Sequence, residues 1–572
     1  MTDIARDTVE AIARSWAVPG GSVVAADRTG VVFEHHFGFA DLGAGIPVRP
    51  HHRFEIGSIS KIFTSTVILR LVREGRLRFD QPIGEVLPWA PAALHGRAIT
   101  IERLLTHTAG LLQSVDALPD EVGQVASFAG TVSDASPGTF FHYSNLGFIL
   151  LGLAAARVTD RTMPDLVRER ILEPLGMRDT VSAVTHDHHA RLARGYQPLR
   201  DDRPWIPGDP LIPAPWLEVA GSDGSVAGTS RDLARFGRML LSRGAAGSGT
   251  PVIDPESFEA MISRVAPEGE ETLVLPGVEP SESSAYGFGV NVERTAGRSV
   301  LTHGGGMVGY ASFLLADLTA GVTVAVVTNA NGDGPVAEAI ARSVAAQLIA
   351  PVAGAAGGTP DPQRWIVAAG AGSLDPDARL GVFEAAGPTG VPLRIEVAVA
   401  EQRAETATLK IISGSETSPL LWNWNGRALT RLSSLRRFPL TFDGSQWLWG
   451  PRVYRRVDES SAHPAPSGDA SDSPTGDAER ERLRTFCGHY RTYSPWFTNF
   501  RIVLRGGALV LIASGGVEAP GDDVELVELA SGTFRLGADP RLPERITFAP
   551  PVDGLSPWAD RDGCRYSRSF TG

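Results

Sequence analysis

The sequence predicts an α+β domain over its first 350 residues, followed by one or two antiparallel β modules. Strand signals open the chain, helical signals fill the middle of this first region, and strand signals return at its end. Such an order lets the first and last strands pair in one antiparallel sheet, with the intervening helices packed on its faces. Beyond residue 362, short aromatic and β-branched runs separated by turn residues indicate β structure alone.

The expected elements of the first domain follow from hydrophobic periodicity and from turn and cap residues. Residues 22–26 and 31–37 are β-rich and are joined by a polar turn ending in glycine, which is typical of a hairpin. An amphipathic helix is expected over 58–74, because Gly75 occupies the position that favours glycine after a helix. Further helices are expected over 100–105, 145–157, 163–175, 230–242 and 336–349, and the returning strands over 286–292, 299–302, 310–316 and 322–327.

The chain of 572 residues is too long for one hydrophobic core, and its composition suggests where the units meet. We expect the α+β domain over 1–350 and a linker rich in glycine, alanine and proline over 351–362. A first β module is expected over 363–458 and a second over 481–572. Residues 459–480 are rich in Ser, Pro, Ala, Gly and Asp and cannot bury enough apolar surface to order themselves, so we expect a flexible linker.

Charge and cysteine content exclude several classes of protein. The formal net charge of −12 argues against nucleic acid as a partner, because nucleic-acid-binding proteins present a basic patch or stripe. Only two lysines occur, Lys61 and Lys410, so arginine carries nearly all the positive charge and the position of each lysine is informative. Two cysteines, Cys487 and Cys564, cannot form a disulfide framework and are expected to be thiols.

The sequence also bears on membranes and location. The first residues are charged and amphipathic and lack the apolar core and cleavage site of a secretion signal. The longest apolar run, 148–156, is closed by Arg157 and is far shorter than the ~20 residues that cross a bilayer. We therefore expect no membrane span and a cytoplasmic location.

The first candidate for chemistry is Ser58 with Lys61. A serine and a lysine three residues apart at the start of a helix lie on one face, one turn apart, so the amine can reach the hydroxyl. A lysine desolvated by apolar neighbours can take the proton of such a serine and make it a nucleophile. The pair alone is a weak signal, because a solvated helix lysine beside an N-cap serine would have the same spacing.

Two further segments carry groups of the same kind. Tyr143 and Asn145 stand where a loop enters a helix, and they could present a phenol and an amide to one cleft, although an Asn N-cap preceded by a core tyrosine is the alternative. His303 precedes Gly304, Gly305 and Gly306, whose backbone could approach a ligand closely while the histidine offers a titratable edge. A glycine-rich connection between strands is the alternative there.

These three segments, in this order, resemble the signature of the β-lactamase-like and penicillin-binding superfamily. The resemblance covers residues 5–350 and extends to the segments 103–111, 173–177, 221–224 and 229–236. It implies a β-lactamase/transpeptidase-like fold, with an antiparallel sheet flanked by helices. The β modules that follow would be lipocalin-like barrels.

The resemblance also implies roles for individual residues. Ser58 would be the nucleophile, Lys61 and Tyr143 would share general-base and general-acid duty, and Asn145 would bridge Lys61 and the substrate. The backbone N–H groups of Ser58 and Gly306 would form the oxyanion hole, with Gly304 and Gly305 beside the substrate. His303 stands where many relatives have lysine, so a fixed cation for a substrate carboxylate is replaced by a mostly neutral imidazole, and efficient β-lactam hydrolysis is not expected.

The His-Gly-Gly form is similar to the esterase, D-aminopeptidase, D-amino-acid amidase and peptide-cyclising thioesterase branches of the superfamily. D-aminopeptidases also carry two β-barrel modules, and in such relatives a module loop can reach the active site, a role for which Arg491 is a candidate here. We expect a serine hydrolase acting on a small ester, a D-amino-acid amide or a short peptide. A peptide-cyclising thioesterase or transpeptidase, a β-lactamase and a non-catalytic ligand-binding protein remain alternatives, and self-association is left open.

Neither a cofactor nor a metal ion is expected. The run from His186 to His189 lies on a polar loop, and adjacent residues do not converge easily on one ion. The sequence contains no Gly-x-Ser-x-Gly elbow, which argues against the α/β-hydrolase form of serine catalysis.

Overall fold

The first domain is built on one antiparallel sheet whose order joins the two ends of the domain. The computed structural model describes residues 2–95, 99–115, 120–128, 130, 132–133, 135–246, 251–330, 335–349, 376–387, 391–403, 406–422, 426–457, 474–517 and 519–571. The sheet has the order β3-β2-β1-β12-β11-β10-β9-β8. Its strands are β1 (Gly20–Asp27), β2 (Val31–Asp41), β3 (Ile46–Pro47), β8 (Ser283–Tyr286), β9 (Asn291–Thr295), β10 (Arg298–Met307), β11 (Tyr310–Asp317) and β12 (Val322–Thr328). Because β1 pairs with β12, from Gly21 opposite Thr328 to Asp27 opposite Val322, the predicted α+β architecture is confirmed.

Two of the expected strands differ from the structure. The strand expected over 286–292 is broken, because β8 ends at Tyr286 and a turn that includes Gly289, at φ +73°, separates it from β9. The strand expected over 299–302 continues instead to Met307 and pairs with β11 from Val300 to Met307. The glycines after His303 therefore lie within a strand and not in a connection.

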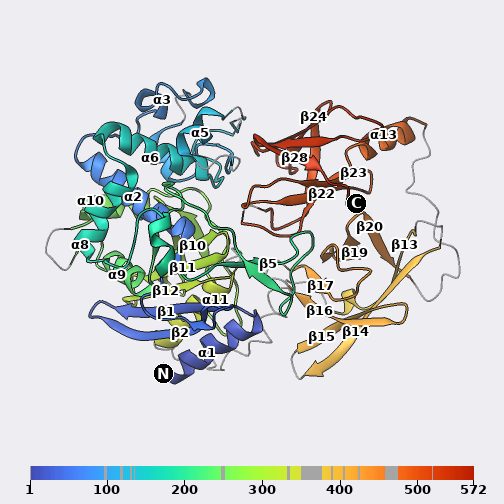
Figure 1. Ribbon diagram of the computed structural model, residues 1–572, viewed down its shortest axis with the longest axis horizontal. Helices are drawn as coiled ribbons and strands as arrows, with labels where there is room; N and C mark the ends of the chain where they lie inside the picture. The colour runs from blue at the N-terminus through green and yellow to red at the C-terminus, as the bar shows by residue number, and fades with distance from the viewer. Residues whose placement is uncertain are drawn as a thin grey trace.

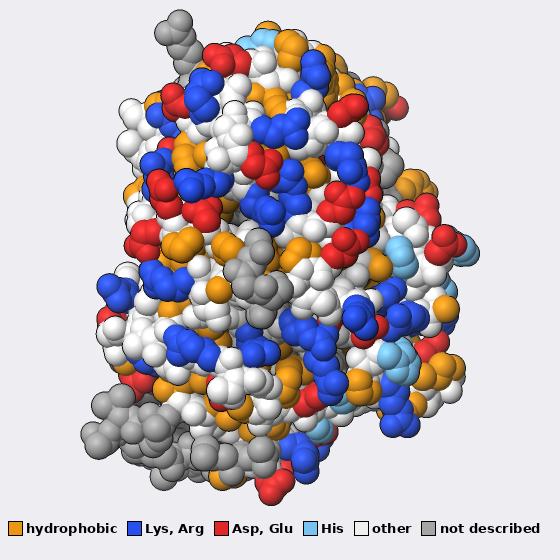
Figure 2. Space-filling view, turned by 90° about the vertical axis from the view of Figure 1, so that its left-hand side faces the viewer, with side chains coloured by type: hydrophobic (Ala, Val, Ile, Leu, Met, Phe, Trp, Pro, Cys, Tyr) orange, Lys and Arg blue, Asp and Glu red, His pale blue; other side chains and the backbone are white. Residues whose placement is uncertain are grey.

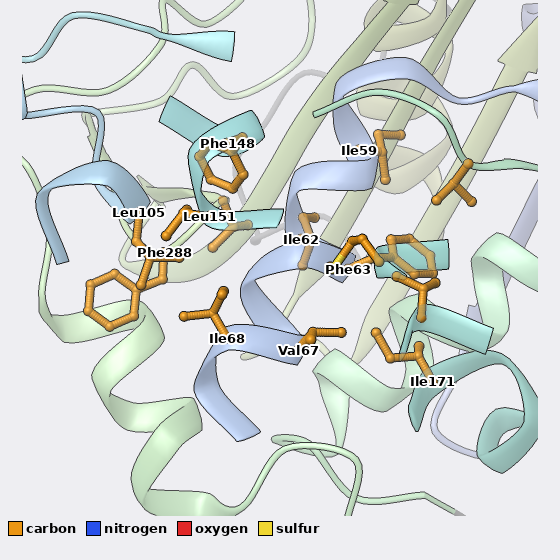
Figure 3. Packing of buried hydrophobic residues seen from close by; sticks show 14 of the residues in the cluster. Ile59, Ile62, Phe63, Val67, Ile68, Leu105, Phe148, Leu151, Ile171 and Phe288 are labelled. Atoms are coloured by element: carbon orange, nitrogen blue, oxygen red, sulfur yellow. The ribbon is translucent and has the colours of Figure 1, made fainter. Parts of the chain in front are cut away.

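The helices cover both faces of the sheet (Figure 1). On one face lies α2 (Ser60–Arg73), preceded by the 3₁₀ turn η1 (Gly57–Ile59), with α6 (Asn145–Thr159) and α9 (Ser230–Leu241). Their apolar side chains, including Ile62, Phe63 and Phe148, form the largest core cluster (Figure 3). On the other face, α1 (Thr2–Ser15) packs with α11 (Pro335–Leu348). The helix expected over 163–175 is interrupted by a π turn and consists of α7 (Met163–Val167), η3 (Arg168–Leu172) and α8 (Glu173–Leu175).

Shorter elements complete the domain and its connections. The remaining helices are α3 (Ile83–Val86), η2 (Ala92–His95), α4 (Ile101–Leu105), α5 (Glu121–Ala126), η4 (His186–Arg191) and α10 (Pro255–Ser263). Two small sheets pair β4 (Phe54–Glu55) with β7 (Ala227–Gly228), and β5 (Tyr196–Pro198) with β6 (Leu211–Pro213). Because β4 ends two residues before η1, the β4–β7 pair holds the start of the segment that carries Ser58.

The C-terminal part contains two closed eight-stranded antiparallel barrels, so the expected β modules are separate barrels. The first consists of β13 (Gly381–Ala385), β14 (Leu393–Arg403), β15 (Thr406–Ser413), β16 (Glu416–Trp422), β17 (Ala428–Thr430), β18 (Leu440–Phe442), β19 (Gln446–Trp449) and β20 (Arg452–Arg456). The second consists of β21 (Gly488–Arg491), β22 (Asn499–Arg505), β23 (Ala508–Ala513), β24 (Val524–Ala530), β25 (Thr533–Leu536), β26 (Arg545–Phe548), β27 (Trp558–Arg561) and β28 (Cys564–Arg568). Cys487 and Cys564 are both free thiols, as expected.

The two expected linkers have different outcomes. The segment 351–362 lies outside the described residues. Of the flexible linker expected over 459–480, the last residues belong to α13 (Pro474–Arg484), which corrects that prediction. The helix is stabilised by ion pairs of Arg482 with Glu479 and Glu528, and Leu483 enters the core of the second barrel. Within the described residues, no helix has the length and apolar character needed to cross a membrane.

Charged side chains lie mostly at the surface. On the face shown in Figure 2, basic side chains lie among acidic ones over the upper part of the view. Some charged side chains of the first domain are buried, and one buried ion pair is that of Arg342 on α11, whose guanidinium donates to both carboxylate oxygens of Glu293 on β9 at 3.0 and 2.9 Å. Glu293 is fully buried; burial alone would raise its pKa, but the charge and hydrogen bonds of Arg342 hold it below its usual value. Glu293 also accepts a hydrogen bond from the hydroxyl of Thr302 on β10, next to His303.

This ion pair gives the first testable prediction. Arg342→Met should lower the free energy of unfolding by about 3–5 kcal/mol, because it leaves a buried carboxylate without its partner. The double variant Arg342→Met/Glu293→Leu should recover much of that loss, because it removes the buried charge as well. Urea unfolding followed by circular dichroism measures both. Arg73→Met, which breaks the exposed pair with Glu256, is the control and should cost less than about 1 kcal/mol; an equal loss in both single variants would contradict the prediction.

Candidate active site

Ser58 lies in the turn that leads into α2, and Lys61 lies in the first turn of that helix. The helix proper begins at Ser60, two residues later than expected, but the two side chains still meet: Lys61 Nζ donates to Ser58 Oγ at 3.0 Å. Ser58 is half-buried, whereas Gly57 and Ile59 on either side of it are buried. Ser58 is thus the residue of this turn that is not fully buried.

Lys61 is held in place from several sides. Its side chain is fully buried, and Nζ also donates to the backbone oxygen of Asp223 at 2.9 Å. Nζ lies 4.9 Å from the ring centroid of Tyr143 and 5.6 Å from that of Phe148. A buried amine in contact with a serine hydroxyl is the arrangement that nucleophile activation by lysine requires.

Tyr143 lies on the loop that enters α6, beside Lys61. Ser144 is the N-cap of α6, since its Oγ accepts from the backbone N–H of Gly147 at 3.1 Å. The alternative in which Asn145 caps the helix is therefore wrong. Asn145 is instead the first residue of the helix, is buried, and donates its backbone N–H to the carbonyl of Gln113 at 2.7 Å. The N-cap bond of Ser144 and the backbone bond of Asn145 thus fix the backbone on which Tyr143 and Asn145 lie.

His107 is a part of the site for which the sequence predicted no role. Its Nδ1 accepts from the backbone N–H of Ser144 at 3.0 Å, and its carbonyl accepts from the N–H of His142 at 2.9 Å. The ring packs 4.3 Å from the ring of Tyr143 between centroids. Burial lowers the pKa of His107 well below its usual value, so the ring is neutral. The positive φ of His107, +56°, was not visible as a signal in the sequence, because such a φ is uncommon for any residue with a side chain.

His303 reaches the same region from β10, but both its ring nitrogens are used inside the protein. Nδ1 lies 2.5 Å from the carbonyl oxygen of Gly304, which can only accept, so Nδ1 carries the proton. Nε2 then accepts from the hydroxyl of Tyr286 at 2.8 Å. The side chain is fully buried, and burial lowers the pKa of His303 to about 3. The titratable edge expected from the sequence is therefore a neutral ring that holds Tyr286.

The three glycines of β10 lie where the sheet meets the start of α2. On the β11 side Gly304, Gly305 and Gly306 are paired, whereas the β9 register ends at Thr302 opposite Asn291, so in the described part of the chain no strand pairs with 303–307 on that side. A Cβ built on Gly57, whose φ is +51°, would lie 2.6 Å from the oxygen and 2.8 Å from the nitrogen of Gly306. The backbone of Gly306 thus lies directly against the residue before Ser58, which is the arrangement that an oxyanion hole from Ser58 and Gly306 requires.

The comparisons with known proteins agree with this geometry. A family model described as beta-lactamase matches residues 5–349. The chain belongs to the beta-lactamase family. It is 29% identical to penicillin-binding protein 4 of Amycolatopsis lactamdurans, over 61% of this chain and 90% of that protein, and 24% identical to a penicillin-binding protein of Bacillus subtilis (strain 168), over 56% and 71%. The structure of an octameric penicillin-binding protein homologue from Pyrococcus abyssi covers 79% of this chain and 99% of its own, with a TM-score of 0.53 and 22% identity, and shows the shared fold.

Membership makes the chain a serine hydrolase of the beta-lactamase and penicillin-binding protein type. In this beta-lactamase family member, two half-buried carboxyl groups near Lys61 were missed by sequence reasoning. Burial raises the pKa of Glu270 to about 7 and raises that of Asp223, while the charge of Lys61 opposes the rise in both. Glu270 accepts from Asn291 Nδ2 at 3.1 Å. Two carboxyl groups with raised pKa values thus lie near the amine of Lys61.

Several other candidates lie outside this site. Arg491 pairs with Asp201 at 2.7 Å and so joins the second barrel to a loop of the first domain. The segment from His186 to His189 lies in η4, and no group of three potential metal ligands occurs among the residues that the structure describes. A cavity of about 710 Å³ between the first domain and both barrels has none of the motif residues in its lining.

The contact between Gly57 and Gly306 gives a prediction. Gly57→Ala should lower kcat/KM by at least about 100-fold, because the added Cβ displaces the Gly306 backbone and with it an oxyanion-hole donor. Gly75→Ala is the matched control at the other end of α2, since Gly75 also has a positive φ, +71°, but a Cβ there would have no atom within 4 Å. The control should lose some stability and retain its activity. Steady-state rates on a nitrophenyl ester test both, and an active Gly57→Ala would contradict the assignment.

A third prediction concerns His303. With a pKa of about 3, its ring stays neutral at every pH above that value, so His303 contributes no ionisation to the rate between about pH 5 and pH 9. His303→Asn should therefore lower kcat/KM without moving the apparent pKa values of the pH–rate profile. An ionisation near pH 6.5 that is present in the wild type and absent from the variant would show that His303 titrates.

Proposed function

We propose that the chain hydrolyses small esters, D-amino-acid amides or short peptides through an acyl-enzyme on Ser58. The observation that carries the proposal is the 3.0 Å hydrogen bond from the fully buried Lys61 to the half-buried Ser58 hydroxyl. The first domain, which we assign to residues 1–350, supplies all of these groups. The expected division of the rest of the chain into linkers and β modules stays part of the proposal.

The proposed reaction has two halves, the acylation of Ser58 and the hydrolysis of the acyl-enzyme, and Lys61 and Tyr143 each transfer one proton in each half. Lys61, as the neutral amine, takes the proton of Ser58 while Oγ forms a bond to the substrate carbonyl carbon. The negative charge that develops on the carbonyl oxygen is stabilised by the backbone N–H groups of Ser58 and Gly306. Tyr143 gives a proton to the departing alcohol or amine as its bond to the carbonyl carbon breaks. In the second half Tyr143, now a phenolate, takes a proton from a water molecule whose oxygen forms a bond to the acyl carbon. The bond between the acyl carbon and Ser58 Oγ then breaks, Lys61 returns its proton to Oγ, and the acid leaves.

Electrostatics supports esters and amine-bearing substrates over β-lactams. The neutral His303 gives no fixed positive charge for a substrate carboxylate, and Asp223 and Glu270 lie within electrostatic reach of Lys61. A substrate with an ammonium group is favoured by such surroundings, and a carboxylate is not. Penicillin binding is the second candidate, because two relatives are named penicillin-binding proteins.

Covalent labelling tests the proposal. Intact-mass analysis after a fluorophosphonate should show one adduct on the wild type and none on Ser58→Ala, because Ser58 is the proposed nucleophile. Ser263→Ala, which removes an exposed serine hydroxyl, is the control and should keep the adduct. Absence of labelling in the wild type, or an unchanged adduct on Ser58→Ala, would refute the mechanism.

Rates measured side by side on nitrophenyl esters, D- and L-aminoacyl anilides and a chromogenic cephalosporin then rank the substrate classes. A stable adduct without turnover on any of them would favour the non-catalytic binding protein. Self-association stays open, although the Pyrococcus homologue is described as octameric. The cytoplasmic location stays a prediction from the sequence.

A further inference from the structure

The second barrel places a buried carboxylate against the segment that carries Tyr143. Glu544 directly precedes β26 and is 8% exposed. Its Oε1 lies 2.7 Å from Nε2 of His142 and accepts from the backbone N–H of Gln113 at 3.0 Å. These partners are 402 and 431 residues away in the sequence, and Figure 1 shows the second barrel beside the helical part of the first domain that contains them.

The two partners of Glu544 lie on either side of the catalytic segment. His142 immediately precedes Tyr143. The carbonyl of Gln113 accepts from the N–H groups of Asn145 at 2.7 Å and of Leu146 at 3.3 Å, at the start of α6. The carboxylate of Glu544 therefore binds His142, the residue before Tyr143, and also Gln113, whose carbonyl binds the residues after Tyr143.

The first domain supplies only part of this support. The backbone of the segment is held by His107, which bonds to the N–H groups of His142 and Ser144, and by Leu112, whose carbonyl accepts from Ser144 Oγ at 2.7 Å. The imidazole of His142 and the N–H of Gln113, by contrast, both bond to the second barrel. The position of the Tyr143 loop is thus shared between two domains.

The surroundings of Glu544 keep it ionised and in place. Burial alone would raise its pKa, but the hydrogen bond and charge of His142 and the N–H of Gln113 lower it below the usual value. Nearby, the guanidinium of Arg541 lies 4.3 Å from the ring centroid of Phe140, which stacks on His142. A buried carboxylate is stable only with such partners, so Glu544 and the segment must fit each other closely.

We propose that Glu544 is a positioning residue of the active site, supplied by the second barrel, which holds Tyr143 and Asn145 in register with Lys61. Its meaning for catalysis rests on the proposed function, in which Tyr143 transfers a proton. Removal of the carboxylate leaves Ser58 and Lys61 in place and lets the proton donor move.

Three full-length variants test this inference. Glu544→Ala should lower kcat on a nitrophenyl ester by at least about ten-fold with KM changed by less than about three-fold, because a displaced proton donor slows the chemical step. Glu544→Gln should retain activity to within about three-fold, since its amide oxygen can accept both hydrogen bonds. Glu525→Ala removes an exposed glutamate of the same barrel and should behave as the wild type. A full loss in Glu544→Gln, or no loss of kcat in Glu544→Ala, overturns the inference.

Hydrogen–deuterium exchange gives a readout that does not depend on turnover. In Glu544→Ala, the amides of Gln113, Asn145 and Leu146 should exchange faster than in the wild type and in Glu525→Ala, while the strands of both barrels remain protected. Unchanged exchange at these amides overturns the inference whatever the activity. If instead the wild type fails to acylate Ser58, the proposed function fails, and the exchange measurement still decides whether Glu544 holds the segment.

Discussion

The close backbone contact between Gly57 and Gly306 joins the helical layer of the first domain to its sheet at the point where the chemistry lies. A side chain at Gly57 would overlap the Gly306 backbone, and Gly305 likewise lies directly against the backbone of Ile56. Because of this approach, the turn that carries Ser58 lies against the edge of β10 that β9 leaves unpaired in the described residues. The helix α2, which carries Lys61, begins directly after this turn.

Burial then sets the charge of the two histidines near Ser58 and shifts the pKa values of two carboxyl groups. His107 and His303 are buried with lowered pKa values and are neutral, and each uses a ring nitrogen to hold a neighbour, the backbone of Ser144 in one case and the Tyr286 hydroxyl in the other. The carboxyl groups of Asp223 and Glu270 have raised pKa values. A site of this kind places the amine of Lys61 beside neutral imidazoles and two carboxyl groups, and it offers a substrate carboxylate no additional fixed cation from His303.

The second barrel makes specific polar contacts with the first domain. The second barrel joins the first domain through the pair of Arg491 and Asp201 and through the contacts of Glu544 with His142 and Gln113. The contacts of Glu544 hold the Tyr143 loop, which lies next to Lys61. They therefore couple the position of this loop to a domain about four hundred residues further along the chain. The three strongest motifs of the sequence all lie in the first domain, so this coupling is a property of the assembled chain.

The sequence by itself determined the α+β order of the first domain, the β character of the rest and the pairing of Ser58 with Lys61, because these depend on local periodicity and on a spacing of one helical turn. It did not determine that His303 accepts a hydrogen bond from Tyr286, that β10 includes the three glycines, or that the helix α13 replaces part of an expected linker. Nor could it select Glu544 over Arg491 as the residue of the second barrel that reaches the Tyr143 loop. Those features depend on which distant segments pack together, and no local sequence pattern records this packing. Burial by the distant segments sets the charge and the hydrogen-bond partners of these side chains.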